Sequence, residues 1–189
     1  MTKKEARKFF KDQRKSIAPS QKQQWDDLIL IQFQQVNLSY LETLFSYLPM
    51  PIQNEVDTVP IVRYLQFMNP QLTTAYPVCD FTNNTMHAAL ADSDTLFITN
   101  RFGAAEPEST RFIAPRQIDL VLVPLLCFDN EGYRVGYGKG FYDRFLSQAR
   151  SDVYKIGLSY FGPIEKITDS DAFDVTLTHC ITPQKIYEF

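Results

Sequence analysis

Helical spacing of apolar residues marks the start of the chain. The apolar positions from Ala6 to Ile17 recur at roughly helical intervals behind a capping box, which predicts an amphipathic helix over residues 3–16. Pro19 is predicted to end this helix, because proline is disfavoured inside helices. A second helix is then predicted over residues 20–37.

Short apolar blocks separated by turn-forming residues fill the rest of the chain. The nearly continuous apolar run of residues 118–128 is typical of a central strand that is covered on both faces. Residues 85–99 contain one or two short elements of undefined type, and the polar, proline-containing residues 100–117 indicate a surface connection. Further strands are predicted at residues 43–49, 71–79, 153–160 and 174–182, and further helices at residues 57–68 and 141–149.

This alternation of strands and helices predicts the fold class. Such an order is typical of an α/β protein, here a three-layer fold with a mostly parallel open sheet and helices on both faces. The length of 189 residues fits a single domain over residues 1–189.

Composition narrows the classes of function. A net charge of -3 argues against a general nucleic-acid binder, and no apolar run is long enough to span a membrane. The N-terminus carries charge without an apolar stretch behind it, so it does not resemble a signal peptide. Three dispersed cysteines and two histidines offer little for a disulfide framework, a zinc site or a Ser-His-Asp triad. These features together predict a cytoplasmic protein without nucleic-acid or membrane partners.

Glycine clustering points to one functional segment. Four of the seven glycines, Gly132, Gly136, Gly138 and Gly140, fall between the apolar run and a predicted helix. Glycine allows close approach of the backbone to a ligand, and ligands of open α/β sheets bind beyond the carboxyl ends of the strands. The alternative is a tight turn, but interleaved Arg and Lys favour a phosphate-binding loop. Neither the dinucleotide fingerprint nor the Walker A pattern fits this loop.

Other charged residues allow two interpretations each. Asp143 either complements a helix dipole or helps to hold Mg²⁺ beside phosphates. Lys3 and Arg7, one helical turn apart, either belong to a solvated basic face or clamp phosphate together. Glu55 is either a turn residue or a carboxylate that points into a site, and Asp174 is equally ambiguous.

The glycine-rich loop is part of a longer motif. Residues 123–146 contain a proline, an apolar stretch, Phe-Asp, a glycine and then R-V-G-Y-G-K-G-F-Y-D. This run resembles the signature of the 5-formyltetrahydrofolate cyclo-ligase (5,10-methenyltetrahydrofolate synthetase) family, with Val135 and Phe141 in place of the usual Leu and Tyr. Weaker signals flank it in the expected order: Lys3 with Arg7, residues 55–58, Glu106 with Pro107, and Asp174 ahead of Ile181 and Thr182.

The resemblance implies an activity and its substrates. The family converts ATP and 5-formyltetrahydrofolate, with or without a polyglutamate tail, into 5,10-methenyltetrahydrofolate, ADP and phosphate, and uses Mg²⁺. The formyl oxygen attacks the γ-phosphorus, and N10 then closes the ring as phosphate leaves. We expect a monomeric ATP-dependent ligase. The alternatives are a non-catalytic ATP- and folate-binding protein of the same fold, or nucleic-acid binding through the basic first helix.

The same resemblance implies the roles of individual residues. Catalytic roles would fall to Arg134, Lys139 and Tyr142. Metal binding would fall to Asp143 and Asp174. ATP would contact Lys3, Lys4, Arg7, Arg134, Gly136, Tyr137, Gly138, Lys139, Gly140, Phe141 and Tyr142. The folate substrate would contact Met50 or Leu48, Glu55, Tyr137, Gly138, Lys139, Gly140 and Phe141.

Overall fold

The computed structural model describes all residues 1–189 and contains six helical segments and twelve strands. The helical segments are α1 (Lys3–Lys15), α2 (Pro19–Phe33), η1 (Pro51–Gln53), α3 (Val59–Met68), η2 (Pro115–Gln117) and α4 (Phe141–Leu146). The strands are β1 (Thr43–Phe45), β2 (Thr73–Asp80), β3 (Thr85–Ala91), β4 (Phe97–Thr99), β5 (Ala105–Pro107), β6 (Phe112–Ile113), β7 (Leu120–Val123), β8 (Cys127–Phe128), β9 (Arg134–Val135), β10 (Tyr154–Leu158), β11 (His179–Ile181) and β12 (Ile186–Glu188).

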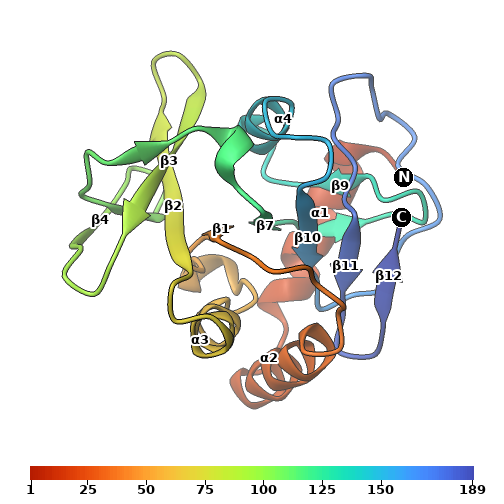
Figure 1. Cartoon of the computed structure of the whole chain (residues 1–189). Coiled ribbons are helices and arrows are strands. Elements are labelled where there is room, and N and C mark those ends of the chain that lie inside the picture. The colour runs from red at the N-terminus through yellow and green to blue at the C-terminus, as the bar shows by residue number, and fades with distance from the viewer.

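An eight-stranded sheet runs through the molecule in the order β12-β11-β10-β7-β1-β2-β3-β6 (Figure 1). The central strands from β11 to β2 are all parallel to their neighbours, whereas β12, β3 and β6 pair antiparallel at the edges. Strands β4 with β5 and β8 with β9 form two separate hairpins. The prediction of a mostly parallel open sheet is confirmed for its centre.

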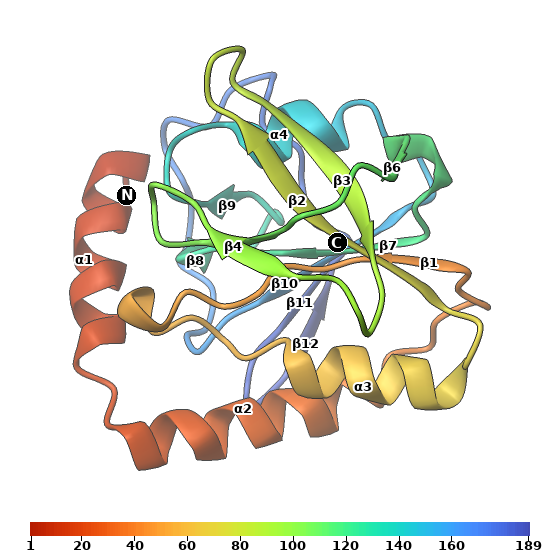
Figure 2. The same cartoon turned by 90° about the vertical axis from the view of Figure 1, so that its left-hand side faces the viewer.

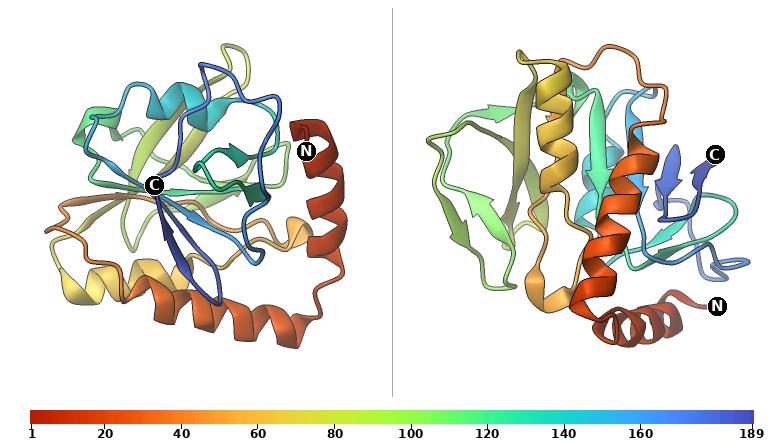
Figure 3. Two further views of the ribbon diagram at one scale, coloured as in Figure 1. Left: turned by 90° about the vertical axis from the view of Figure 1, so that its right-hand side faces the viewer. Right: turned by 90° about the horizontal axis from the view of Figure 1, so that it is seen from below.

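Helices cover both faces of this sheet, as predicted. Figure 2 shows α2 and α3 below the strands and α4 above them, and Figure 3 shows the same layers from the opposite side and from below. Each face of the sheet carries a hydrophobic core. Alternate residues of β7 pack into these two cores, because successive side chains of a strand point to opposite faces. Leu122 packs in the core of α2 and α3, whereas Val123 packs in the core that contains Phe145 of α4.

Helix α1 covers neither face of the sheet. It lies at the end of the sheet where the β8–β9 hairpin is found (Figure 2). Its apolar stripe, Ala6 and Phe10, packs against Leu126, Cys127 and Val135 in a small third core. The predicted capping box is present, since the Thr2 hydroxyl accepts from the backbone of Glu5. This position brings the basic face of α1 to the carboxyl ends of the central strands.

Several predicted boundaries differ from the structure. The apolar run of residues 118–128 is not one strand, because β7 ends at Val123 and Pro124 offers no N–H to continue the ladder. The chain leaves the sheet there and forms β8, which pairs with β9. The predicted strand over residues 174–182 is only β11, and the predicted strand over residues 43–49 is only β1.

The prediction of a plain surface connection over residues 100–117 is wrong. This segment contains β5, β6 and η2, and its Glu106 side chain is buried. Residues 85–99 contain two strands, β3 and β4. Pro19 does not merely end the first helix, since it is the first residue of α2, where its missing N–H costs nothing. No helix combines the length and hydropathy that a transmembrane span requires.

The packing of β10 gives a stability prediction. A methyl group on Gly157 would come within 2.7 Å of a methyl of Leu177, and still closer to Leu125, in the sealed core. We expect Gly157→Ala to lower the free energy of unfolding by about 1–3 kcal/mol through overpacking. Gly162→Ala is the matched control, because its nearest neighbour would be 3.7 Å away. Urea denaturation of both variants would measure the difference, and equal stabilities would contradict the prediction.

Candidate functional site

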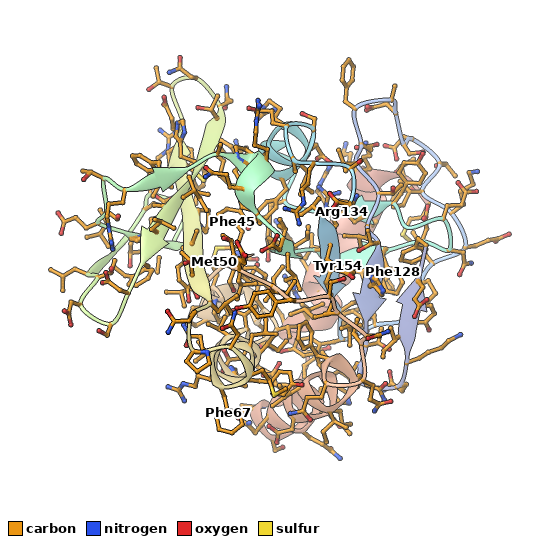
Figure 4. All side chains as sticks on the ribbon, viewed as in Figure 1. Phe45, Met50, Phe67, Phe128, Arg134 and Tyr154 are labelled. Carbon is orange, nitrogen blue, oxygen red and sulfur yellow. The ribbon has the colours of Figure 1, made fainter.

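A cleft of about 510 Å³ lies beside α1 and the β8–β9 hairpin. Its walls are α1, the segment of residues 47–55 after β1, strand β2, the β4–β5 hairpin and the loop of residues 136–140. Met50 from the segment after β1 and Arg134 from β9, both labelled in Figure 4, line the cleft. The cleft therefore lies at the carboxyl ends of parallel strands β1 and β7, where open α/β sheets bind ligands.

The glycine-rich loop of residues 136–140 forms one wall. Gly138 and Gly140 have φ values of +89° and +67°, a left-handed backbone that favours glycine. The Arg7 Nε donates 3.0 Å to the carbonyl oxygen of Gly136. A Cβ on Gly138 would lie 3.1 Å from the guanidinium carbon of Arg7. The loop thus rests on α1, and its glycines permit that close approach.

Cations gather at this end of the cleft. Lys3, Arg7, Arg134 and Lys139 all line it. Lys3 Nζ forms an ion pair with Asp174 at 2.6 Å. The Lys139 Nζ makes no ion pair and lies 5.4 Å from the centre of the Phe102 ring. Such a concentration of positive charge around a glycine loop suits a polyphosphate.

Arg134 is buried and bridges two segments. Its Nη2 forms a 2.8 Å ion pair with Asp143 Oδ1, and its Nη1 donates to the backbone carbonyl of Val175. The backbone N–H of Val175 donates back to the same Asp143 oxygen. This closed set of contacts ties the start of α4 to the segment before β11.

The two predicted metal ligands differ in how much of each carboxylate is free. Asp143 Oδ1 is hydrogen-bonded, but its Oδ2 accepts no hydrogen bond. Both oxygens of Asp174 are occupied, by Lys3 and by the backbone N–H of Asp171. No group of three or more His, Cys, Asp or Glu side chains is placed to hold a metal ion. A single free carboxylate fits Mg²⁺, which is commonly bound by one or two carboxylates together with phosphates and water.

Glu55 forms the acidic centre of the opposite wall. Its carboxylate accepts from the Met50 backbone N–H at 2.7 Å and from the Tyr137 hydroxyl at 2.6 Å. Burial raises the pKa of Glu55, although these hydrogen bonds and the Arg14 charge oppose the rise. Glu55 is therefore a buried acceptor that is held in a fixed orientation, rather than an ordinary turn residue.

Aromatic side chains form an apolar surface in the same cleft. The Phe81 ring packs against Phe102 and Phe141, with centroid distances of 4.9 and 5.6 Å. Tyr47, Leu48 and Met50 line the cleft near Glu55. A buried carboxylate among apolar walls suits a flat heteroaromatic ligand with N–H donors.

The hydroxyl of Tyr142 is buried and has no hydrogen-bond partner in the protein. The residue lines the cleft, and burial raises the pKa of its phenol well above the usual value, so it keeps its proton. Buried polar groups are nearly always hydrogen-bonded in native proteins. An orphan donor at this position is therefore ready to bind a ligand oxygen.

Nearly all sequence-predicted site residues are brought together in this cleft. Those that line it are Lys3, Arg7, Leu48, Met50, Glu55, Arg134, Gly136, Tyr137, Gly138, Lys139, Gly140, Phe141, Tyr142, Asp143 and Asp174. Lys4 is the exception, and its prediction as an ATP contact needs correction. Because consecutive helix residues point about 100° apart, Lys4 is exposed to solvent on another side of α1 and does not line the cleft.

Sequence reasoning missed part of the β4–β5 side of the cleft. Glu106 is buried there and accepts from the Asn100 side chain at 2.7 Å and from the Cys79 backbone at 3.1 Å. The Glu106-Pro107 pair was the available signal, but Asn100 sits in a segment that is predicted to be only a connection. Further lining residues without a sequence signal are Lys11, Tyr47, Gln53, Pro77, Phe81, Met86, Phe102, Ala104 and Ala105, whereas Pro124 is the proline of the family signature.

Comparison with known sequences identifies a single family. The model of the 5-formyltetrahydrofolate cyclo-ligase family matches residues 1–183. A 5-formyltetrahydrofolate cyclo-ligase of Mycoplasma pneumoniae is 33% identical over 111 residues, which are 58% of this chain and 56% of the relative. That alignment thus spans about half of the relative's length. The enzyme of that name from Escherichia coli K12 is 23% identical over 96% of this chain and 100% of its own.

Solved structures agree with the sequence comparison. A 5,10-methenyltetrahydrofolate synthetase from Mycoplasma pneumoniae superposes with a TM-score of 0.77 at 27% identity, covering 97% of this chain and 99% of that one. The NMR structure of the Aquifex aeolicus 5,10-methenyltetrahydrofolate synthetase gives a TM-score of 0.81 at 25% identity, covering 100% and 93%. Both cover nearly the whole molecule.

Proposed function

The chain belongs to the 5-formyltetrahydrofolate cyclo-ligase family, and from this premise we propose that it catalyses the ATP-dependent cyclisation of 5-formyltetrahydrofolate to 5,10-methenyltetrahydrofolate. One observation carries the proposal. A single cleft combines a cationic glycine loop with a buried carboxylate among aromatic walls. The first suits a polyphosphate and the second suits a pterin. Both substrates would therefore meet in one enclosed space.

The proposed ATP position follows from the cations. The phosphates would lie along the glycine loop, where Lys3, Arg7 and Arg134 would neutralise their charge. Mg²⁺, when bound, would draw charge from the β- and γ-phosphates. Asp143 would hold it through its free Oδ2, and Asp174 would join only after exchanging its Lys3 partner.

The proposed folate position follows from Glu55. The carboxylate would accept hydrogen bonds from the N–H groups of the pterin ring, with Met50 and Leu48 packing on the ring. A pterin lacking those N–H groups would leave a buried acceptor unpaired, which penalises the wrong ligand. The aromatic residues Phe81 and Phe102 would cover the remainder of the folate.

The proposed chemistry needs no covalent protein nucleophile. The formyl oxygen on N5 attacks the γ-phosphorus and the bond from that phosphorus to ADP breaks, which leaves the formyl oxygen phosphorylated and the formyl carbon electrophilic. N10 then attacks that carbon, N10 loses its proton and the C–O bond to phosphate breaks. Arg134 and Lys139 would stabilise the charge on the transferring phosphoryl group. The Tyr142 hydroxyl would donate to a ligand oxygen, and the two bound substrates would fill the cleft and keep water from the electrophilic formyl carbon.

A direct assay tests this function. Purified protein with Mg²⁺, ATP and 5-formyltetrahydrofolate should produce the absorbance of the methenyl product, with one ADP formed per product. Reactions without ATP, or with a non-hydrolysable ATP analogue, serve as controls. Binding of both substrates without turnover would favour the non-catalytic alternative, and binding of neither would reject the proposal.

Neighbouring lysines offer a matched pair of variants. Lys3→Met should raise the KM for ATP by roughly tenfold, because a cation facing the phosphates is lost. Lys4→Met should leave that KM within about twofold, because its side chain points to solvent. Initial rates at varied ATP would measure both effects. An equal increase in the two variants would contradict the assignment of Lys3 to the phosphates.

A further inference from the structure

Arg14 is a buried cation without a carboxylate partner. Only 4% of it is exposed, although the adjacent Lys15 in the same last turn of α1 is exposed to solvent. Its Nη1 donates 3.1 Å to the carbonyl of Leu125, and its Nε is buried without any partner. Burying a charge is costly unless it is paired, so such a residue calls for an explanation beyond stability.

The remaining donor of Arg14 leads into the cleft. Arg14 Nη2 donates 2.5 Å to the Tyr137 hydroxyl, which in turn donates 2.6 Å to Glu55 Oε1. Arg14 is thus connected to the Glu55 carboxylate through one phenol oxygen. Because the phenol proton points at Glu55, the hydroxyl lone pairs are free to accept from Arg14. The three groups form a directed chain from cation to carboxylate.

Tyr137 links two parts of the site. Its backbone lies in the glycine loop between Gly136 and Gly138, and Arg7 holds the Gly136 carbonyl. Its side chain crosses the cleft to the wall that carries Glu55. Any movement of the loop therefore moves the hydroxyl relative to the carboxylate.

The backbone of Glu55 is also held by a contact outside this chain of hydrogen bonds. The Tyr160 hydroxyl contacts the Glu55 carbonyl at 3.1 Å and Asp26 at 2.7 Å. The groups whose charge or protonation bears on Glu55 come from several elements. They are Arg14, Lys22, Asp26, Tyr47, Tyr137, Tyr142 and Tyr160. Arg14 and Lys22 are the cations among them, and Arg14 is the one joined to Glu55 through a hydrogen-bonded hydroxyl.

We infer that Arg14 is a positioning residue that holds Tyr137 against Glu55 and so couples the ATP-binding loop to the folate-binding carboxylate. This inference rests on the proposed function. The Arg14–Tyr137–Glu55 chain is already formed in the structure, so phosphates that hold the loop in this position also hold Glu55 in its orientation as an ionised acceptor. Each substrate then binds more tightly in the presence of the other, and the coupling is reciprocal.

The test uses Arg14→Met and Tyr137→Phe, with Lys15→Met as the control from the exposed side of the same turn. Calorimetry would give the Kd of 5-formyltetrahydrofolate with and without a non-hydrolysable ATP analogue, between pH 5 and 8. In the unmodified protein the analogue should tighten folate binding. Both test variants should weaken folate binding by roughly tenfold or more and abolish that tightening.

The pH dependence separates positioning from packing. Loss of the cation favours the neutral form of Glu55, so its pKa rises further. In Arg14→Met, folate binding should weaken with falling pH from a midpoint at higher pH than in the unmodified protein. Arg14→Lys should restore that midpoint in part, because it returns the charge without the guanidinium geometry. Lys15→Met should change neither quantity.

Each outcome decides the inference. Weaker binding with an unchanged pH midpoint and intact tightening by the analogue would overturn it and leave Arg14 a packing residue. If Arg14→Met fails to fold, Tyr137→Phe, which removes a single oxygen atom, tests the same coupling on its own. The readout is binding, so it remains decisive even if turnover is absent and the proposed cyclisation fails.

Discussion

Arg134→Met is expected to reduce kcat/KM for ATP by roughly a thousandfold, because it removes a buried charge that the proposed mechanism places beside the transferring phosphoryl group. The variant also leaves Asp143 without its ion-pair partner in a half-buried position. A free Asp143 carboxylate next to phosphates adds repulsion to the lost attraction. Steady-state kinetics at saturating 5-formyltetrahydrofolate would measure the effect, and the loss should fall mainly on kcat.

Stability must be measured alongside, because Arg134 also anchors the backbone of Val175. Removing one partner of a buried ion pair lowers the free energy of unfolding by about 3–5 kcal/mol. The assays should therefore be run well below the melting temperature of the variant. Arg134→Lys keeps the charge but loses the bidentate geometry and should retain partial activity. Arg150→Met is the control, since Arg150 forms a partly exposed pair with Asp119 and does not line the cleft. A folded Arg134→Met variant with normal kcat/KM would contradict the assignment.

Glu55→Gln is expected to raise the KM for 5-formyltetrahydrofolate by roughly a hundredfold, with little change in the KM for ATP. The amide keeps the size of the side chain. However, its NH₂ group would face a donor, either the Met50 N–H or the Tyr137 hydroxyl, where a carboxylate oxygen now accepts. The remaining carbonyl oxygen cannot serve both donors and the pterin. Substrate discrimination should suffer more than catalysis.

The raised pKa of Glu55 determines the direction in which folate binding changes with pH. Burial raises the pKa of Glu55 above its ordinary value of 4.5. Folate binding in the unmodified protein should therefore weaken as the pH falls through that raised pKa, because the protonated carboxyl loses an acceptor. Glu55→Gln should show no such weakening. Gln53→Glu, a change two residues away that adds a carboxylate at another point of the wall, should retain the pH profile. A parallel pH profile in Glu55→Gln would show that another group is responsible.

The sequence identifies the catalytic end of the fold well, for physical reasons. The glycine loop is detectable because left-handed backbone at Gly138 and Gly140 excludes most other residues. The central strands are detectable because strands covered on both faces require continuous apolar residues, as in β7. A feature that requires one residue type, such as the glycine loop, or burial on both faces, such as strand β7, can be predicted directly from the sequence.

Features that depend on pairing partners are not readable in this way. Pro124 lies inside an apolar run, so the end of β7 and the turn into β8 follow from a missing N–H rather than from hydropathy. Strand β4 is exposed although it contains Phe97 and Ile98, and β5 buries Glu106 beside the cleft, so polarity does not indicate which side of this hairpin faces solvent. Strand β12 is too short for a periodic signal and is defined only by its pairing with β11.

Arg14 illustrates the same limit at the level of a single side chain. Patterns of polarity count arginine as a solvent-facing residue, and the first helix contains many basic residues. The spacing of four residues places Arg14 in line with Ala6 and Phe10, but only the tertiary structure shows that it is buried with them. Arg14, whose burial the sequence does not indicate, is thus one of the most deeply buried charged residues of the molecule.

The placement of α1 has a consequence for synthesis of the protein. The helix leaves the ribosome well before its packing partners Leu126, Cys127 and Val135, which are translated more than a hundred residues later. Until then its apolar stripe has no native surface to cover, and such segments favour misassembly in nascent chains. The basic residues on its other face would keep the waiting helix soluble. Because Lys3, Arg7 and Arg14 come with it, a nascent chain would gain activity only in a late docking event.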